Sequence, residues 1–512
     1  MRKWGPLLAV CLGTTMLLLD VTIVTVALPA MAAGLGVRLS GLQWVIDVYA
    51  LALAAFLLSA GSLADLLGRR RLFLAGMVIF AVGSLACGLA PTAGLLITAR
   101  AVQGVGGAAM FATALSLLGS TYQGRDRGTA LGVWGAVSGA AAAAGPIVGG
   151  VLTESLGWRW IFLVNLPISV VAAALTWFVV RESRGPRDRR IDFAGMVTLT
   201  VAASATTYGI ITGDANGWLS ARTLGVFALA VVGLVAFVVV ERKIQHPMLD
   251  LRLFGRPAFV GVMLAGFAFQ VASFSVLAYA SIWMQSLLGY SALRTGLIQA
   301  PLSAASFVAS LLVGRRLHTT SPRYVIAGAL LVIAVGDWAQ VVLSGSSSGW
   351  VLIPGMVVVG IGVGVMAPAI SGAALGAVGP ERAGMAGGAL NTARQLGLAL
   401  GVAIFGAVAV NAAQHVLAGR VGDAHATAQG LLGGAGQTLL QAAPASSRAG
   451  LEVVLRGAFA NGLNSAMLGA GLVAFLAAVA AFVLMRAKKP SPETSSGSDI
   501  PELRSSVAVP GR

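Results

Sequence analysis

Long stretches without a charged side chain divide this sequence, and they limit what the chain can fold into more than any other feature. An apolar helix of ~20 residues spans the ~30 Å hydrocarbon core of a bilayer. Only 10% of the residues are charged and 57% are hydrophobic, with a mean hydropathy of +0.88, whereas a soluble domain carries about a quarter charged residues. Lipid must therefore be the solvent of runs such as 72–99, 128–153, 160–180, 193–213 and 457–485.

The apolar runs predict an all-α membrane protein with about 14 spanning helices. An even number of spans places both termini on the same side of the membrane. The expected helices are 7–31, 43–64, 72–90, 95–119, 129–153, 159–180, 192–212, 223–240, 258–284, 295–314, 324–343, 350–376, 385–410 and 461–485.

Basic residues gather in alternate loops, and this pattern predicts the orientation. With both termini, the loops of one parity hold 25 of the 34 Lys and Arg residues. Because cytoplasmic loops are enriched in Lys and Arg, we expect both termini of this multi-pass protein in the cytoplasm. A net charge of +16 could indicate a nucleic-acid partner in a soluble protein, but here the bases follow the topology, so we expect none.

A weak internal repeat predicts the domain organisation. Gly68–Arg70 recurs as Gly314–Arg316, and Gly124–Gly128 has a counterpart in Gly379–Gly384. Duplicated halves with a site at their interface are common in secondary transporters. We expect a six-helix bundle over 1–185, two linking helices over 186–257, a six-helix bundle over 258–485 with an outer loop at 411–460, and a disordered cytoplasmic tail at 486–512.

Charged residues inside the predicted helices are the strongest functional candidates. At 1.5 Å per residue, Asp20 lies ~20 Å into its helix, and an ionised carboxylate facing lipid would cost at least ~2.5 kcal/mol. Asp20 should therefore face the bundle interior at the height of Arg100. A proton or a cationic cargo could then compete with Arg100 for Asp20, although a permanent structural pair remains an alternative. Asp47 is a second coupling candidate, or an acid near the headgroups.

Polar residues in two further helices are candidates for the substrate cavity. Gln103 lies one turn deeper than Arg100 and can bond to either charge state, or simply join two helices. In the predicted helix 385–410, Asn391 and Gln395 share a face with Arg394 nearby. This group either contributes to a central cavity or clamps a neighbouring helix. Asp337 is another intramembrane acid. The two cysteines and four histidines do not form a metal site.

The segment between the second and third predicted helices resembles the signature of the major facilitator superfamily. It reads Gly-Ser-Leu-Ala-Asp-Leu-Leu-Gly-Arg-Arg-Arg, and its gating residues would be Gly61, Asp65, Gly68, Arg69 and Arg70. In this arrangement the glycines allow close helix contact, and the charges can form a latch between domains. A plain positive-inside loop is the alternative.

Further motifs are similar to those of the 14-helix drug:proton antiporters within that superfamily. They are Leu19–Pro29, with Thr25 where the family usually has Asn, Arg100–Ala108, Gly145–Gly150, Trp158–Pro167 and Asn391–Gly397. The antiporter motif of the fifth helix would comprise Gly145, Pro146, Gly149 and Gly150, while its upstream glycine is replaced by Ala141. Pro146 removes a backbone hydrogen bond, so we expect a bend there, or tight packing. The resemblance also implies a peripheral helix around Asp337.

The resemblance implies a proton-coupled efflux antiporter for drugs, antibiotics or other amphipathic small molecules. No phosphate-binding loop is present, so we expect no enzymatic activity and no cofactor, only the proton gradient. The expected partners are the substrate, protons and lipid, with the chain a monomer. A proton symporter for a nutrient and a non-transporting sensor or scaffold are the alternatives, and the Gly-Pro element argues against the symporter.

Overall fold

The computed structural model describes residues 3–486 except 38, 185–191, 246, 248, 314–319 and 379–382. Beyond residue 486, the predicted tail lies outside these described residues, as does the side chain of Asp65. The predicted all-α fold class is confirmed. The α-helices are α1 Gly5–Leu35, α2 Leu39–Leu67, α3 Arg69–Gly88, α4 Ala93–Thr121, α5 Gly124–Ser155, α6 Trp160–Leu163, α7 Asn165–Val179, α8 Phe193–Asn216, α9 Ala221–Lys243, α10 Pro257–Phe274, α11 Leu277–Ser286, α12 Ala292–Val313, α13 Pro322–Ala339, α14 Ile353–Gly376, α15 Ala383–Leu417, α16 Ala424–Leu432, α17 Gly436–Ala442 and α18 Ala445–Leu484.

Several helices begin and end at residues that satisfy free backbone groups. The side chains of Thr92, Asp192 and Ser220 accept hydrogen bonds from backbone N–H groups in the first turns of α4, α8 and α9. These groups have no partner within the helix, so side-chain caps stabilise the helix starts. Gly36 ends α1 with a φ of 63°, a left-handed conformation that glycine adopts without strain.

Twelve helices within the described residues are long and apolar enough to cross a membrane, which establishes a multi-pass membrane protein. They correspond to all the predicted helices except 43–64 and 129–153. Those two appear as α2 and α5, with 29 and 32 residues, and only Trp44–Leu57 of α2 qualifies as a shorter apolar helix. The count of 14 spans stays a prediction.

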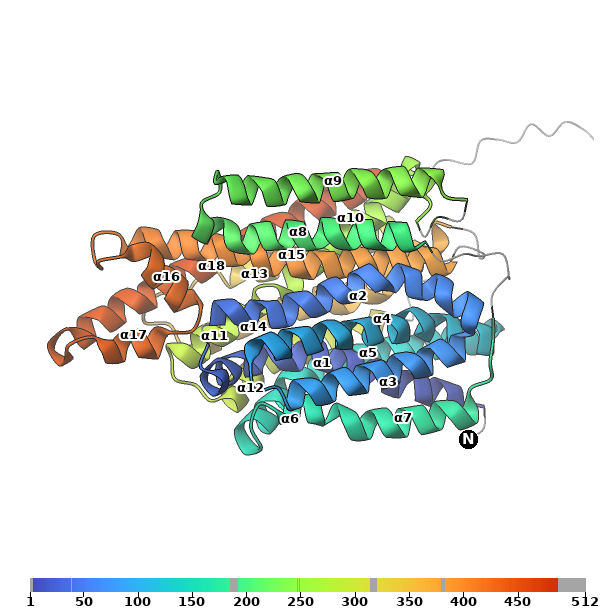
Figure 1. Ribbon diagram of the computed structural model, residues 1–512, viewed down its shortest axis with the longest axis horizontal. Helices are drawn as coiled ribbons and strands as arrows, with labels where there is room; N and C mark the ends of the chain where they lie inside the picture. Colours follow the sequence, from blue (N-terminus) through green and yellow to red (C-terminus); the bar gives the residue numbers. More distant parts are fainter. Residues whose placement is uncertain are drawn as a thin grey trace, which may run out of the picture.

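The helices run roughly parallel to one long axis (Figure 1). Helices α1 to α7 contact one another extensively, as do α10 to α18, while α8 packs on α9, α2 and α15. Contacts between the two groups are mainly those of α5 with α12, α2 with α15 and α1 with α11. We call the end that carries α16 and α17 the loop end, and the end where α1 begins the terminal end. The predicted domain boundaries remain predictions.

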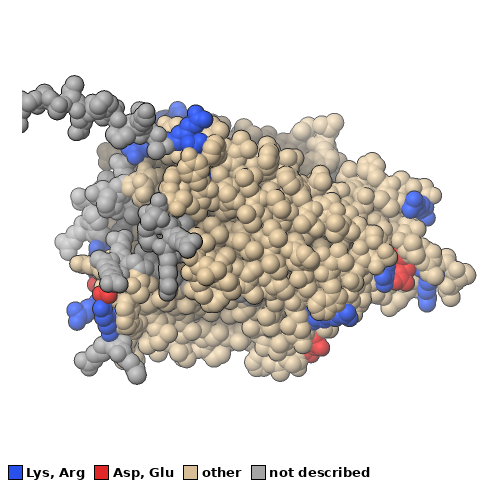
Figure 2. Space-filling view, turned by 180° about the vertical axis from the view of Figure 1, so that it is seen from behind, with Lys and Arg blue, Asp and Glu red and all other residues tan. Residues whose placement is uncertain are grey.

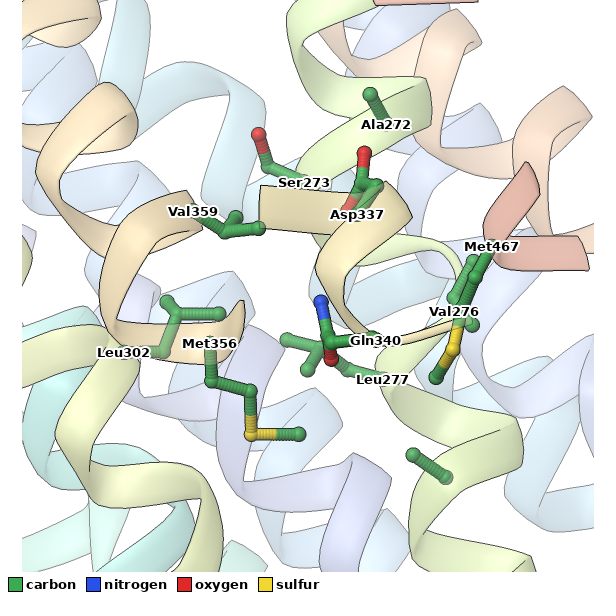
Figure 3. A pocket seen from close by; sticks show the side chains of 11 residues that line it. Ala272, Ser273, Val276, Leu277, Leu302, Asp337, Gln340, Met356, Val359 and Met467 are labelled. Atoms are coloured by element: carbon green, nitrogen blue, oxygen red, sulfur yellow. The ribbon is translucent and has the colours of Figure 1, made fainter. Parts of the chain in front are cut away.

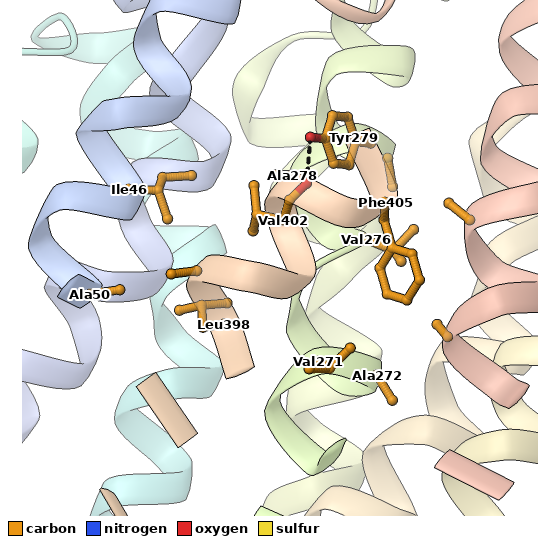
Figure 4. Packing of buried hydrophobic residues seen from close by; sticks show 14 of the residues in the cluster. Ile46, Ala50, Val271, Ala272, Val276, Ala278, Tyr279, Leu398, Val402 and Phe405 are labelled. Atoms are coloured by element: carbon orange, nitrogen blue, oxygen red, sulfur yellow. Dashed lines mark hydrogen bonds between the residues drawn. The ribbon is translucent and has the colours of Figure 1, made fainter. Parts of the chain in front are cut away.

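The contact between α2 and α15 is built from aliphatic side chains. Ile46 and Ala50 of α2 face Leu398 and Val402 of α15 (Figure 4). The Tyr279 hydroxyl donates a 2.8 Å hydrogen bond to the Val402 carbonyl, and so ties α11 to the same helix. Small and branched residues here let the helix backbones approach closely, the main source of attraction between helices in lipid.

One prediction about the second half of the chain needs correction, and one predicted helix contains an irregular turn. The predicted helix 258–284 is found as the span Pro257–Ser286, in which Ser275 and Val276 separate α10 from α11 while keeping right-handed helical backbone angles; we call this irregular turn the α10–α11 break. The segment 411–460, expected to be at most partly ordered, is largely helical. It contains the end of α15, the whole of α16 and α17, and the start of α18, because its alanine and glutamine residues favour helix.

The outer surface agrees with a lipid environment. Figure 2 shows Lys and Arg near the two ends of the molecule, and a broad tan region between them on the face in view. Helix α9 exposes a row of large aliphatic side chains, including Leu229, Val231, Val232, Leu234 and Val235. An exposed apolar surface of this extent would be unstable in water, but it is the expected lipid-facing surface of a spanning helix.

Candidate functional site

A buried ion pair between α1 and α4 is the centre of the candidate site. Arg100 Nη1 lies 2.5 Å from Asp20 Oδ2, and each residue is only 1% exposed. The structure therefore pairs Asp20 with Arg100, while their depth in the membrane and their role in coupling stay predictions. Because an unpaired charge in lipid is costly, each side chain gives the other a partner of opposite formal charge.

Arg100 is also held by groups on α2. Its Nε donates to the Val45 carbonyl at 3.0 Å, and its guanidinium lies 4.1 Å from the centre of the Tyr49 ring. A planar guanidinium can combine ion pairing, hydrogen bonding and ring stacking in this way, which a lysine cannot. Three helices therefore meet at Arg100, and the α1 acid is connected to α2 through it.

Amide side chains complete the coordination of Asp20. Gln103 Nε2 and Asn165 Nδ2 donate to Asp20 Oδ1 at 2.9 and 3.1 Å. Both amides also contact the Ser84 hydroxyl, at 3.2 and 3.0 Å. Gln103 Oε1 in turn accepts from Arg100 at 2.8 Å. Gln103 is fully buried and thus belongs to the hydrogen-bonded group around Asp20. Its predicted place in the substrate cavity stays a prediction.

Sequence reasoning assigned no role to Asn165, Ser84, Tyr49 or Val45. An asparagine in an apolar helix is a usable signal for Asn165, since a buried amide requires partners. Serine and tyrosine are common in spanning helices, and a backbone carbonyl leaves no trace in the sequence. Their contacts with Asp20 and Arg100 could be predicted only if the rotation of α2 and α3 about their own axes were known.

Asp47 is a buried acid of a different kind. It is 0% exposed, and neither of its carboxylate oxygens has a hydrogen-bond partner. Both alternatives for Asp47, a coupling acid and an acid near the headgroups, stay predictions. One turn earlier on α2, the Trp44 ring lies 6.0 Å from the ring of Tyr208 on α8. Asp47 does not join the hydrogen-bonded group around Asp20.

Of the candidates on α15, Arg394 faces α10. The Arg394 guanidinium lies 5.2 Å from the centre of the Phe269 ring on α10, and its Nε is buried without a hydrogen-bond partner. Gln395 Oε1 is similarly unpartnered, and Asn391 is 9% exposed. The structure does not bring these three residues into contact with the Asp20 group, and their place in a cavity stays a prediction.

The predicted gating segment forms a tight turn between α2 and α3. Gly68 has a φ of 107°, and the Glu182 carboxylate occupies the space beside it. Glu182 accepts hydrogen bonds from the backbone N–H groups of Arg70 and Arg71 at 3.1 and 3.2 Å. It therefore caps the start of α3, where an acid is electrostatically favoured. Glu182 was not predicted.

Arg70, Arg69 and Gly61 are the other gating residues among those that the structure describes. The Arg70 guanidinium lies 4.8 Å from the centre of the Trp177 ring on α7. The backbone N–H of Arg69 donates to the Ser183 carbonyl at 2.9 Å. A side chain at Gly61 would meet open space. The latch between domains stays a prediction.

The helix 5 motif packs α5 against two helices at once. A Cβ atom at Gly145 or Gly149 would overlap Thr22 or Ile23 of α1. A Cβ at Gly150 would overlap the backbone at Leu293 of α12. Helix α5 continues through Pro146. The tight-packing interpretation is therefore borne out, and the bend stays a prediction.

Polar contacts also join the two groups of helices near the loop end. Gln285 Nε2 of α11 donates to the Val26 carbonyl of α1 at 2.9 Å. The backbone N–H of Leu293 donates to Glu154 of α5 at 3.3 Å. Toward the terminal end, side chains added at Gly372, Gly376 or Gly387 would meet open space. Among the described residues, close contacts between the groups are thus found from mid-height to the loop end (Figure 1).

Comparisons with known proteins agree with this architecture. The chain is 38% identical to the multidrug resistance protein Stp of Mycobacterium tuberculosis, over 78% of this chain and 75% of that protein. It is 35% identical to the puromycin resistance protein pur8 of Streptomyces alboniger, over 85% of this chain and 87% of that protein.

A solved structure shares the fold. It is the crystal structure of a bacterial homolog to the human lysosomal transporter Spinster, with a TM-score of 0.61 and 18% identity, covering 94% of this chain and 97% of that chain. The family model of the Major Facilitator Superfamily matches residues 10–402. This is a family of transporters and not of enzymes. The chain belongs to the Major Facilitator Superfamily.

Proposed function

We propose that this chain is a proton-coupled antiporter that exports amphipathic small molecules, such as drugs or antibiotics, by alternating access. It would reside in the cytoplasmic membrane as a monomer with both termini in the cytoplasm, using the proton gradient and no cofactor. The names of its relatives, multidrug and puromycin resistance proteins, support export of toxic compounds. The basic loops at the terminal end support the orientation.

The observation that carries the proposal is the path from the ion pair to the contact between the halves. Asp20 lies on α1, and the next turn of α1 presents Thr22 and Ile23 to Gly145 and Gly149 of α5. Gly150 on the same helix contacts α12. A shift of α1 on protonation of Asp20 would therefore reach the α5–α12 contact through packed backbones that leave no space for independent movement.

The proton would change the ion pair in a defined way. Protonation of Asp20 neutralises the carboxyl and leaves Arg100 without its counter-ion, although Val45 and Gln103 still accept its hydrogen bonds. The amides of Gln103 and Asn165 can donate to either form of the acid. Asp20 is 1% exposed in this conformation, so proton exchange with water requires the other conformation. That requirement couples proton movement to the change of access.

The proposal is tested with everted membrane vesicles from a pump-deficient host that produces the full chain. A pH gradient, acid inside, is monitored with a fluorescent weak base while amphipathic cations such as ethidium and neutral antibiotics such as puromycin are added. Antiport predicts that a substrate accelerates loss of the gradient in vesicles with the protein and not in empty-vector vesicles. A resistance profile of the same host selects the compounds. Uptake into right-side-out vesicles driven by an inward proton gradient would instead indicate symport.

A further inference from the structure

A small cavity lies inside the second group of helices, away from the site described above. It lies between α10, α11, α12, α13, α14 and α18, with a volume of about 20 Å³. Its polar lining is formed by Asp337, Ser273 and Gln340, and Leu302, Met356 and Met467 are among its apolar lining residues (Figure 3). Asp337 lies on the inner face of its helix at 4% exposed, whereas the neighbouring Trp338 is 38% exposed, and the peripheral position of this helix stays a prediction.

The cavity adjoins the break between α10 and α11. Ser273 precedes the break, Val276 forms part of it and Leu277 follows it, and all three line the cavity. The Ser273 hydroxyl is buried without a hydrogen-bond partner. Helix interruptions inside a membrane are tolerated where they line a polar space that can satisfy the freed backbone groups. The break, the unpartnered serine and the acid therefore share one polar space.

No base pairs with Asp337 in the part of the chain that the structure describes. Its Oδ2 atom is buried without a hydrogen-bond partner, and the cavity lining contains no basic residue. The described residues of α10, α11 and α14 carry no charged side chain. The following titratable groups on the elements packed around Asp337 have other partners. The guanidinium groups of Arg323 and Arg294 lie over the rings of Phe482 and Tyr290. Arg456 forms an ion pair with Glu452, Arg448 donates to the Ala443 carbonyl, and Tyr279 donates to the Val402 carbonyl.

The size of the cavity limits what it can hold. A volume of about 20 Å³ accommodates about one water molecule, and no organic substrate. An ionised carboxylate with no cation would be strongly destabilised in these surroundings. The neutral carboxylic acid, by contrast, can donate its own O–H to a water or to a neighbouring oxygen. A proton is the ligand that fits both the space and the missing charge.

We propose that Asp337 is a proton-binding site in the second half of the protein, with its carboxyl protonated in this conformation and solvated through one internal water. The proton is taken from a hydronium ion and leaves to water, with no other bond made or broken. Asp20, in the first half, is paired with Arg100 in the same conformation. The two acids therefore have different surroundings, because Asp20 contacts a base and Asp337 contacts none among the described residues.

The use of this proton in transport rests on the proposed function, whereas its binding does not. If the second half changes its packing during alternating access, α13 and the α10–α11 break would expose Asp337 to water, and the proton would leave. A second acid then contributes to the number of protons exchanged for each substrate. The two parts of the inference need separate measurements.

The binding site is tested by infrared difference spectroscopy on the purified full chain in lipid nanodiscs. We expect a carbonyl-stretch band of a protonated carboxylic acid at neutral pH that is lost in Asp337→Asn. Glu452→Gln is the matched control, because Glu452 is an exposed carboxylate paired with Arg456, and it should leave the band unchanged. A band identical in the wild type and Asp337→Asn would overturn the site.

Two further results keep the test decisive. If Asp337→Asn does not give a monodisperse protein, Asp337→Glu is used instead. The carbonyl-stretch band should then persist at a shifted frequency. An unshifted band would overturn the proposed site. A sodium-dependent rise in melting temperature that Asp337→Asn abolishes would also overturn the proton-binding site, in favour of a metal-cation site.

The transport part of the inference needs its own measurement. Asp337→Asn should reduce the number of protons exchanged per substrate molecule. Wild-type vesicles without exchange would contradict the proposed function alone, since the infrared band does not depend on it.

Discussion

Asp20 of α1 and Arg100 of α4 form an ion pair in which both side chains are at most 1% exposed. Removing one partner of a buried pair typically destabilises a protein by ~3–5 kcal/mol, because the other charge is left without compensation. The pair is therefore both a structural joint of the first group of helices and, in our account, the switch that the proton operates.

Arg100→Ala should lower stability strongly and abolish substrate-driven proton movement. We expect a loss of ~3–5 kcal/mol, measured as a drop in melting temperature of the purified protein. The double variant Asp20→Asn/Arg100→Gln removes both charges, so it should be more stable than Arg100→Ala while remaining inactive. Equal stability of these two variants would show that charge compensation is not the reason for the loss.

Asn165→Ala should weaken coupling without removing either charge. The Asn165 amide donates to Asp20 and contacts Ser84, and loss of a buried partner typically costs ~1–3 kcal/mol. Asn165→Asp should be worse than Asn165→Ala, because it places a second carboxylate beside Asp20. The measurement is the rate of substrate-dependent proton movement across a pH series. An unchanged pH profile in Asn165→Asp would contradict the assigned contact.

The loop-end contact of α5 with α12 should open during transport. Cysteines are introduced in place of Glu154 and Leu293, where the Glu154 carboxylate accepts a 3.3 Å hydrogen bond from the backbone N–H of Leu293. The natural Cys11 and Cys87 are first replaced by serine or alanine. A short thiol-reactive cross-linker should arrest transport, and a reductant that cleaves the linker should restore it. The two single-cysteine variants are the controls. Full transport by the cross-linked protein would show that this contact stays closed.

Glu182 should be a stabilising cap of α3. Glu182→Ala removes the acceptor for the N–H groups of Arg70 and Arg71, and loss of a helix cap costs ~0.5–2 kcal/mol. Glu182→Gln keeps a hydrogen-bond acceptor and should retain most of the stability. Thermal unfolding of the three proteins provides the comparison. A larger loss in Glu182→Gln than in Glu182→Ala would mean that the side chain acts in another way.

The sequence predicted the features that depend on hydropathy and depth. Charge-free runs gave the helices, and helix rise placed Asp20 and Arg100 at one height, where they do pair. It did not predict Ser84 or Asn165 as partners, because depth along a helix says nothing about rotation around its axis. The α10–α11 break occurs at Ser275 and Val276, where neither glycine nor proline marks it. The sequence did not predict the helices within 411–460, where alanine and glutamine, which favour helix, alternate with glycine, which disfavours it.

Active accumulation of a dye by everted vesicles tests the central claim most directly. An imposed pH gradient, acid inside, should drive ethidium, or another substrate from the resistance profile, into vesicles that contain the wild-type protein. Asp20→Asn, produced at the same level, should give no accumulation above the empty-vector control. If Asp20→Asn vesicles accumulate the substrate at the wild-type rate, the exchange of a proton for a cargo molecule at Asp20 is contradicted.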